Sequence, residues 1–220
     1  MKALILAAGR GERMRPLTDV LPKPLLEVRG KPLLLWHVEK LVACGFSEIV
    51  INIAHLGFKI PAYLGDGSRY GIKISYSDEQ KSGALESAGG IKKALSLLGD
   101  ETFLVVNGDV FCDYIFDSSF ELKDNLAHLI LVQNPPHNPH GDFGLDNNYA
   151  LNTAKEMYTF SGIGYYAPKL FASLSDIPSA LAPLLREEIN NNKITATLHS
   201  GYWHDIGTPQ RLQEINNKQT

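Results

Sequence analysis

The sequence predicts an α/β fold, in which an open, mostly parallel sheet is covered by helices on both faces. Short, almost wholly apolar segments alternate along the chain with longer segments whose apolar residues recur at helical spacing. Apolar runs without polar alternation are typical of parallel strands that are buried on both faces. Strands separated by helices need crossover connections, which produce a parallel sheet.

The first 132 residues contain the clearest of these elements. The expected strands cover residues 3–7, 48–53, 72–77, 102–106 and 127–132, and the expected helices cover residues 31–45, 56–64 and 88–98. The first of these helices has Pro32 near its start and Gly45 at its end, where these residue types are favoured. Its residues Leu34, Val38 and Leu41 fall on one face. We therefore expect these elements to form one sheet with helices on both sides.

The pattern changes after residue 132. A loop rich in proline, asparagine and histidine covers residues 133–140. It is followed by expected strands at 143–151, 160–166 and 194–198, and by helices at 180–190 and from Pro209 onward. We expect a single domain over residues 1–220, made of a core (1–132) and an α+β elaboration (133–220) packed on the same sheet.

The composition indicates which kinds of partner and which cellular compartment to expect. The formal net charge of −3 argues against a general affinity for nucleic acid or for anionic membranes. The two cysteines form no CxxC pair, which suits a reducing compartment. The opening apolar run stops at Gly9, and no segment approaches the ~20 apolar residues of a membrane span. We therefore expect a cytoplasmic protein without nucleic-acid or membrane partners. The sequence does not give its oligomeric state.

A glycine- and arginine-rich segment follows the first expected strand. It reads LAAGRGERMRPLT over residues 6–18 and is followed by PKP at residues 22–24. Gly9 and Gly11 would let backbone amides approach an anion, and the arginines and Lys23 add positive charge. This combination suits a polyphosphate, although a structural turn accounts equally well for the two glycines alone. Neither the Walker nor the Rossmann glycine motif is present, since Met14 stands where the third Rossmann glycine belongs.

Two aspartates stand in distinctive surroundings. Asp109 ends the segment VVNGD (105–109), directly after an expected buried strand. It suits a Mg²⁺ ligand, and a turn formed by its side chain is the structural alternative. Asp205 lies in WHDIGTP (203–209), where Thr208 before Pro209 is the better cap for the last helix. Asp205 is therefore expected to be free for a metal.

Taken together, these segments resemble the signature of sugar-1-phosphate nucleotidyltransferases, and the resemblance spans nearly the whole chain. It implies a Rossmann-like, glycosyltransferase-A-like sheet and Mg²⁺ as cofactor. The implied substrates are a nucleoside triphosphate and a sugar 1-phosphate, with pyrophosphate released. Residues 1–132 would then bind the nucleotide, and residues 133–220 the sugar.

The resemblance also implies site residues. The implied catalytic residues are Arg15 and Lys23, which contact phosphates, and Asp109 and Asp205, which hold the metal. The implied nucleotide-binding residues are Ala8, Gly9, Gly11, Glu12, Arg13, Lys23, Glu79, Gly83 and Gly89. The implied sugar-binding residues are Asn107, Asp142, Ser161 and Gly162.

The segment LESAG (85–89) corresponds to the part of the family motif that lies beside the base. Its Glu86 resembles uridylyltransferases and favours UTP, whereas guanylyltransferases that act on mannose 1-phosphate more often carry glycine there. Guanylyl transfer remains the alternative within the family. A catalytically silent nucleotide-binding regulator is the alternative from another class, although it would not need all four catalytic residues. A dinucleotide-binding dehydrogenase lacks its glycine fingerprint.

Overall fold

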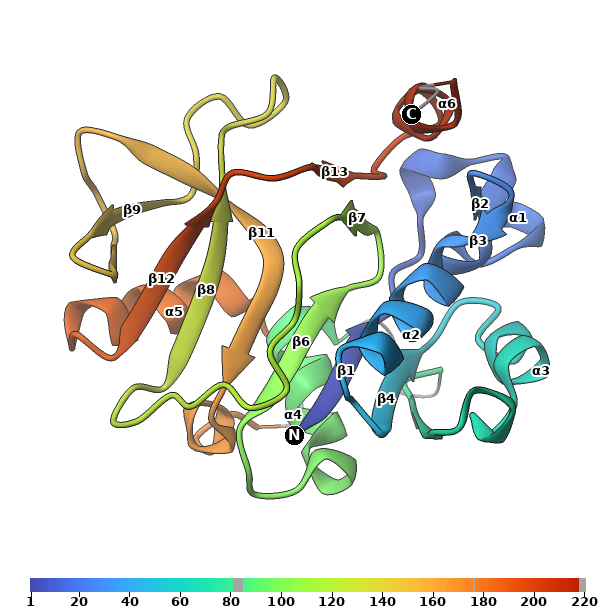
Figure 1. The fold of residues 1–220 in the computed structure, drawn as a ribbon, viewed down its shortest axis with the longest axis horizontal. Coiled ribbons are helices and arrows are strands. Elements are labelled where there is room, and N and C mark those ends of the chain that lie inside the picture. The colour runs from blue at the N-terminus through green and yellow to red at the C-terminus, as the bar shows by residue number, and fades with distance from the viewer. Residues whose placement is uncertain (81–84, 176, 218–220) are drawn as a thin grey trace.

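The computed structural model describes residues 1–80, 85–175 and 177–217 (Figure 1). Within these residues, one nine-stranded sheet has the order β5-β4-β1-β6-β11-β8-β12-β10-β9. Its strands are β1 (Lys2–Leu6), β4 (Glu48–Ile53), β5 (Lys73–Asp78), β6 (Phe103–Asn107), β8 (Ala127–Val132), β9 (Phe143–Asp146), β10 (Tyr149–Leu151), β11 (Met157–Tyr166) and β12 (Ile194–His199).

The helices and two small ribbons complete the fold. The α-helices are α1 (Leu17–Val20), α2 (Leu33–Ala43), α3 (Lys59–Leu64), α4 (Glu86–Leu98), α5 (Leu181–Asn190) and α6 (Pro209–Asn217). One ribbon pairs β2 (Glu27–Val28) with β3 (Lys31–Pro32), and the other pairs β7 (Val110–Cys112) with β13 (Trp203–Asp205). None of the helices in the described ranges is long and apolar enough to cross a lipid bilayer.

The expectation of a mostly parallel sheet is confirmed for one half of the sheet only. Strands β5, β4, β1 and β6 run parallel to one another. In contrast, β11 runs antiparallel to both β6 and β8, and β10 runs antiparallel to β9 and β12. Because β11 also pairs with β9, strands β8, β12, β10, β9 and β11 close into a small barrel. The sheet is therefore mixed, and its second half is not open.

The single strand expected over residues 143–151 is wrong. The structure has a hairpin there, in which β9 and β10 are joined by Asn147 and Asn148. These two residues have φ angles of 44° and 66°, in the left-handed region that asparagine tolerates better than most residues. A two-residue turn with positive φ at both residues matches the twist of a hairpin, and this turn reverses the chain.

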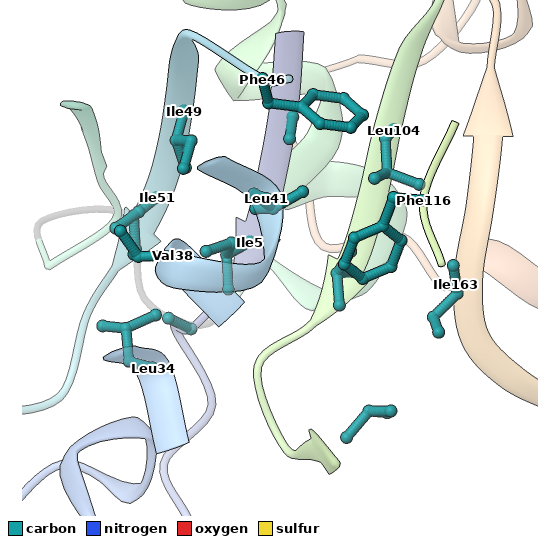
Figure 2. Packing of buried hydrophobic residues seen from close by; sticks show 14 of the residues in the cluster. Ile5, Leu34, Val38, Leu41, Phe46, Ile49, Ile51, Leu104, Phe116 and Ile163 are labelled. Carbon is teal, nitrogen blue, oxygen red and sulfur yellow. The ribbon is translucent and has the colours of Figure 1, made fainter. Parts of the chain in front are cut away.

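Helices cover both faces of the parallel half, as expected. Helix α2 lies in front of the sheet and α4 behind it (Figure 1). Leu34, Val38 and Leu41 of α2 pack against Ile5 of β1 and Ile51 of β4 (Figure 2). The neighbouring side chain on β1, that of Leu4, packs in the second cluster with α4. This alternation follows from the pleat, which directs successive side chains to opposite faces.

The carboxyl ends of β1 and β6 meet in the middle of the sheet. Leu6 lies opposite Asn107 in the register of these two strands. The next residue, Gly108, donates its amide to the carbonyl of Leu6 at 2.9 Å. A Cβ atom at Gly108 would lie 2.7 Å from that carbonyl oxygen, so only glycine allows this approach. The glycine thus lets the loop after β6 lie directly against the loop after β1.

Candidate active site

A pocket of about 230 Å³ opens at these strand ends. Ligands of open α/β sheets bind beyond the carboxyl ends of the strands, so the pocket lies where the fold predicts a site. The residues that the sequence singled out and that line the pocket are Ala8, Gly9, Lys23, Glu79, Asn107 and Asp109. The parallel half of the sheet therefore gathers residues from four separate segments of the chain around one cavity.

The loop after β1 depends on Gly11. This residue has a φ of +64°, and a Cβ atom there would lie 2.8 Å from Cγ2 of Thr18. The hydroxyl of Thr18 donates to the carbonyl of Gly11 at 2.8 Å and closes the loop. Gly9 differs, because a Cβ atom there would meet no atom within 4 Å. Packing therefore requires glycine at residue 11, whereas Gly9 leaves open space beside the pocket.

The charged residues of this loop lie in more exposed places. Glu12 forms an ion pair with Arg10 at 3.6 Å, and Arg15 pairs with Asp19 at 3.2 Å. Arg13 is exposed as well. Arg10 and Arg15 border a second hollow that shares Ala8 and Glu79 with the main pocket. Arg10 and Arg15 thus form a basic rim beside the pocket rather than part of its lining.

Among the described residues, Lys23 is the cation that lines the pocket. It lies in a short 3-10 turn between Pro22 and Pro24, and its side chain is 12% exposed. Its Nζ atom lies 2.6 Å from Oδ2 of Asp109. The two prolines restrict the backbone on either side of Lys23. The charge pair joins the loop after β1 to the loop after β6.

The ribbon of β7 and β13 brings the two predicted aspartates together. Asp205 of β13 lies opposite Val110 of β7, and the amide of Ile206 donates to the carbonyl of Asp109 at 2.8 Å. Figure 1 shows how this happens: after β12, the chain crosses from the barrel over β7 to reach α6. Residues 96 positions apart in the sequence thereby become neighbours on one ribbon.

Asp205 is not free, contrary to the expectation from the sequence. Thr208 does cap α6, since its Oγ1 accepts the amide of Arg211 at 3.3 Å. However, both carboxylate oxygens of Asp205 accept hydrogen bonds from the guanidinium of Arg211. Nε2 of His137 lies 2.9 Å from Oδ1 of the same carboxylate. Arg211 lies only six residues after Asp205, on α6, whereas His137 comes from the distant loop before β9.

The donor set at the ribbon suits one type of metal. In the described part of the chain, no group of three or more His, Cys, Asp or Glu side chains is arranged to hold a metal ion. A closed structural zinc site needs about four such ligands. Mg²⁺ instead takes one or two carboxylates and completes its shell with water and substrate phosphates. The two aspartates predicted from the sequence, Asp109 and Asp205, would supply two carboxylates of that kind.

The predicted sugar-binding residues lie around a bulge in β11. The register of β11 against β8 shifts between Phe160 and Ile163. Within this bulge, Gly162 has a φ of +79°, and a Cβ atom there would lie 2.6 Å from Nδ2 of Asn107. Ser161 is buried, and its hydroxyl accepts the amide of Ile163 at 3.2 Å. Oδ2 of Asp142 accepts the amide of Phe160 at 2.8 Å. Asp142 and Ser161 therefore hold the backbone that presents Gly162 beside Asn107.

The remaining predicted residues are spread along the other wall. Gly83 lies outside the described residues. Gly89 does not line the pocket, because it packs against the carbonyl of Ile177, which a Cβ atom would approach to 2.8 Å. Glu86 begins α4 at the pocket rim with a φ of 58°, a conformation that favours glycine. The side chain of Glu86 is exposed at this rim. Its positive φ is an unfavourable backbone conformation for a residue other than glycine.

Glu79 is a buried carboxylate beside the pocket, with 1% of its surface exposed. Burial raises the pKa of its carboxyl group, while hydrogen bonds from Asn52 and from the Leu85 amide oppose that shift. Sequence reasoning missed Asn52, which contacts Glu79 at the pocket floor. The signal was present, because Asn52 is a polar residue inside the otherwise apolar segment IVINI. A buried amide in such a strand needs specific hydrogen-bond partners.

The fold and the site define an α/β protein with a pocket at the carboxyl ends of its parallel strands. The comparisons make this class specific. The family model described as nucleotidyl transferase matches residues 2–220. The chain belongs to this nucleotidyl transferase family. A Bacillus anthracis structure assigned as a glucose-1-phosphate thymidylyltransferase superposes with a TM-score of 0.85 at 26% identity, over 98% of this chain and 94% of the other.

Two curated relatives set the range of similarity. The N-acetylmuramate α-1-phosphate uridylyltransferase of Neisseria meningitidis serogroup B is 52% identical, over 97% of this chain and 96% of that protein. The glucose-1-phosphate thymidylyltransferase of Streptomyces griseus is 30% identical over 98% of this chain, but only 65% of that protein is covered. The chain therefore matches the first relative over nearly its full length and the second over about two thirds.

Proposed function

We propose that this protein transfers a uridylyl group from UTP to N-acetylmuramate α-1-phosphate. The products are UDP-N-acetylmuramate and pyrophosphate, and the reaction belongs to peptidoglycan recycling. The observation that carries the proposal is the similarity to the Neisseria uridylyltransferase, at 52% identity over nearly all of both chains. Glu86 at the pocket rim supports the same choice of nucleotide, because it matches the uridylyltransferase form of the base-side motif. The two cysteines, both free, fit the reducing cytoplasm.

The main obstacle in this reaction is electrostatic. The sugar phosphate and the triphosphate are both anions, and an oxygen of the first must approach the α-phosphorus of the second. The attacking oxygen is already ionised, so the reaction needs no general base, and we assign none. Catalysis then depends on positioning the two phosphates and on neutralising their charge.

The chain's own residues supply much of this neutralisation. The amides of the loop around Ala8 and Gly9 line the pocket and can cradle phosphate oxygens. Lys23 lines the same pocket, and its ammonium would neutralise charge near the α-phosphate. Arg15 at the basic rim and the exposed Arg13 would hold the outer phosphates. Glu12, on the same turn, stays close to this rim through its pairing with Arg10.

Asp109 and Asp205 are the residues that would hold Mg²⁺. When bound, this ion would neutralise phosphate charge and fix the two phosphates relative to each other. On the ribbon of β7 and β13, Asp205 lies opposite Val110, the residue after Asp109. Lys23 lies 2.6 Å from Asp109, so it would add positive charge beside the bound ion.

We assign the sugar to the region between β6 and β11. Asn107 lies at the end of β6, and the bulge of β11 places Gly162 against it. Asp142 and Ser161 support this bulge through hydrogen bonds to its backbone. Residues 133–220 thus act as the sugar-binding part of a single domain.

The direct test is a substrate matrix. UTP, GTP, dTTP and CTP are each incubated with the 1-phosphates of N-acetylmuramate, glucose, mannose and N-acetylglucosamine in Mg²⁺, and pyrophosphate release is measured. We expect the highest kcat/KM for UTP with N-acetylmuramate 1-phosphate. Higher kcat/KM for GTP with mannose 1-phosphate would replace the proposed substrates. No release with any pair would indicate a silent nucleotide-binding protein.

A further inference from the structure

Two polar side chains are buried together beneath the pocket. Asn52 is 3% exposed and Glu79 is 1% exposed, although both border the cavity. Asn52 lies at the end of β4, opposite Leu6 of β1. Glu79 follows β5 directly and is anchored by its amide, which donates to the carbonyl of Ile53 at 2.8 Å. The pair thus lies between the ends of three parallel strands.

A continuous chain of hydrogen bonds runs through this pair. The amide of Ala7 donates to Oδ1 of Asn52 at 2.6 Å. Nδ2 of Asn52 donates to Oε1 of Glu79 at 2.7 Å, and the amide of Leu85 donates to Oε2 at 3.4 Å. We call this chain the Asn52–Glu79 bridge. It joins the residue that opens the loop after β1 to the residue that precedes α4.

Helix α4 is shaped to fit the bridge. A Cβ atom at Gly90 would lie 2.7 Å from Oε1 of Glu79 and 2.9 Å from Nδ2 of Asn52. Glycine at this residue therefore allows the helix to lie directly on the two polar groups. Every bond of the bridge uses a defined donor and a defined acceptor, so the bridge has one arrangement.

Stability alone does not account for such an arrangement. Burying a carboxylate with an amide commonly stabilises a fold less than an apolar pair of similar volume, whereas removing one partner is costly. A fully satisfied polar network instead fixes the relative geometry of the segments that it joins. Here those segments are the two walls between which a nucleotide would bind.

We propose that Asn52 and Glu79 are positioning residues, whose bridge sets the spacing between the loop after β1 and the start of α4 for the bound nucleotide. This inference rests on the proposed function, and it changes the predicted role of Glu79. Both of its oxygens accept from protein donors, so it would act on the nucleotide through the placement of Ala7 and Leu85.

The bridge can be tested by reversing its central bond. In Asn52→Asp, two carboxylates face each other, and in Glu79→Gln, one end of the amide presents a donor to a donor. In the double variant Asn52→Asp/Glu79→Gln, the introduced carboxylate accepts from the Ala7 amide and from the introduced amide nitrogen. The oxygen of that same introduced amide accepts from Leu85. The double variant therefore restores every bond and keeps the total charge.

The dissociation constant of UTP, measured by calorimetry, is the readout, with the thermal midpoint and KM against kcat beside it. We expect each single variant to weaken UTP binding about tenfold, the equivalent of one hydrogen bond, and the double variant to recover to within about threefold of wild type. Ser77→Ala is the matched control, because Ser77 is buried on β5 opposite Asn52 but takes no part in the bridge. It should leave the UTP affinity unchanged.

Two results would overturn the bridge. One is single variants that are folded and bind UTP as wild type does. The other is a double variant that binds no better than the weaker single variant. Failure of the proposed function has a different signature, because wild type would then bind another triphosphate of the substrate matrix instead of UTP, and the same series would be measured with that nucleotide. A wild type that binds none of the four would overturn both proposals.

Discussion

The two halves of the sheet differ in how they supply the candidate active site. In the parallel half, made of β5, β4, β1 and β6, the site residues follow directly on strand ends. In the barrel half, made of β8, β12, β10, β9 and β11, they lie in a bulge and in the segment that leaves the barrel after β12. The parallel half thus provides a ready-made pocket, whereas the segment that leaves the barrel carries Asp205 on β13 beside β7. The proposed carboxylate pair would therefore draw one aspartate from each half.

The largest expected effect comes from removing one carboxylate from each half. Asp109→Asn and Asp205→Asn should each lower kcat by about 10³-fold or more, because a bound metal contributes several kcal/mol to the barrier and 1.4 kcal/mol is a factor of about ten. Pyrophosphate release in saturating Mg²⁺ is the measurement.

Asp113→Asn is the matched control for this pair. Asp113 follows β7 directly, but its carboxylate binds Nε2 of His199 at 2.8 Å instead of facing the pocket. Its variant should keep most of the activity. Full activity in one of the two site variants would contradict the proposal that each half of the sheet supplies one necessary carboxylate.

The next largest effect concerns the acid stability of the barrel. Burial lowers the pKa of His128 on β8 from 6.5 to about 4. As the pH falls from 6.5 towards 4, the unfolded chain takes up this proton and the folded chain does not. The free energy of unfolding therefore decreases over that window, by about 3 kcal/mol at most for one such histidine.

Replacing His128 with Gln should flatten this acid slope in denaturant titrations at a series of pH values. Burial also lowers the pKa of His37 on α2, in the parallel half, to about 4. The slope should consequently become shallower without being abolished. His140→Gln, at an exposed site, should leave the slope as in wild type. Parallel pH profiles for His128→Gln and wild type would show that the barrel does not hold a neutral histidine.

A smaller effect is expected at Gly162, where an added side chain would cause backbone strain and also a close contact with Asn107 of the other half of the sheet. Gly162→Ala should lower the free energy of unfolding by about 2 kcal/mol, because φ is +79° and the new Cβ atom would meet Asn107 at 2.6 Å. The same contact should raise the KM for the sugar phosphate, which steady-state kinetics would measure.

Gly99→Ala provides the control for strain. Gly99 has a similar φ of +87°, but a Cβ atom there would have no neighbour within 4 Å. It should lose stability without a change in KM. Equal KM values for the two variants would place the sugar away from Asn107 and the bulge.

The smallest effect is expected from a single hydrogen bond that connects the β7–β13 ribbon to the barrel; we call this bond the tie. Nε1 of Trp203 donates to the carbonyl of Ser161 at 2.9 Å, and this bond links β13 to β11. Trp203→Phe should cost about 1 kcal/mol of stability and reduce kcat, because Asp205 loses part of its support. Trp36→Phe removes an equivalent bond to the carbonyl of Val28, at 2.8 Å, outside this tie. It should lower the thermal midpoint similarly and leave kcat unchanged; a matching loss of kcat would argue against a special role for the tie.

The difference between the two halves of the sheet also explains which features of the strands could be predicted from the sequence. The bounds of β4 and β8 were predicted to the residue, because both strands are apolar runs with clear ends. The direction of pairing could not be predicted in this way. All six residues of β8 are buried, and the strand pairs antiparallel with β11 and parallel with β12. Burial on both faces makes a run apolar in either case, so β8 indicated a buried strand but not a parallel one.

The site was predictable where it depends on local sequence and not where it depends on distant contacts. Lys23 and Asp109 were found through their own motifs, and both line the pocket. The strands β7 and β13 have three residues each, too few for any periodicity to be recognised. The contact of Arg211 with Asp205 spans only six residues and depends on the turn into α6, whereas the contact of His137 with the same carboxylate joins distant segments.

The decisive experiment is to locate a divalent cation in the site. A crystal grown with Mn²⁺ and UDP-N-acetylmuramate would be measured at the manganese absorption edge, so that anomalous scattering marks the ion. We expect one ion, with oxygens of both Asp109 and Asp205 and of the diphosphate within coordinating distance. An ion bound by neither carboxylate, or by one while the other keeps its present partners, would contradict the assignment of the carboxylate pair.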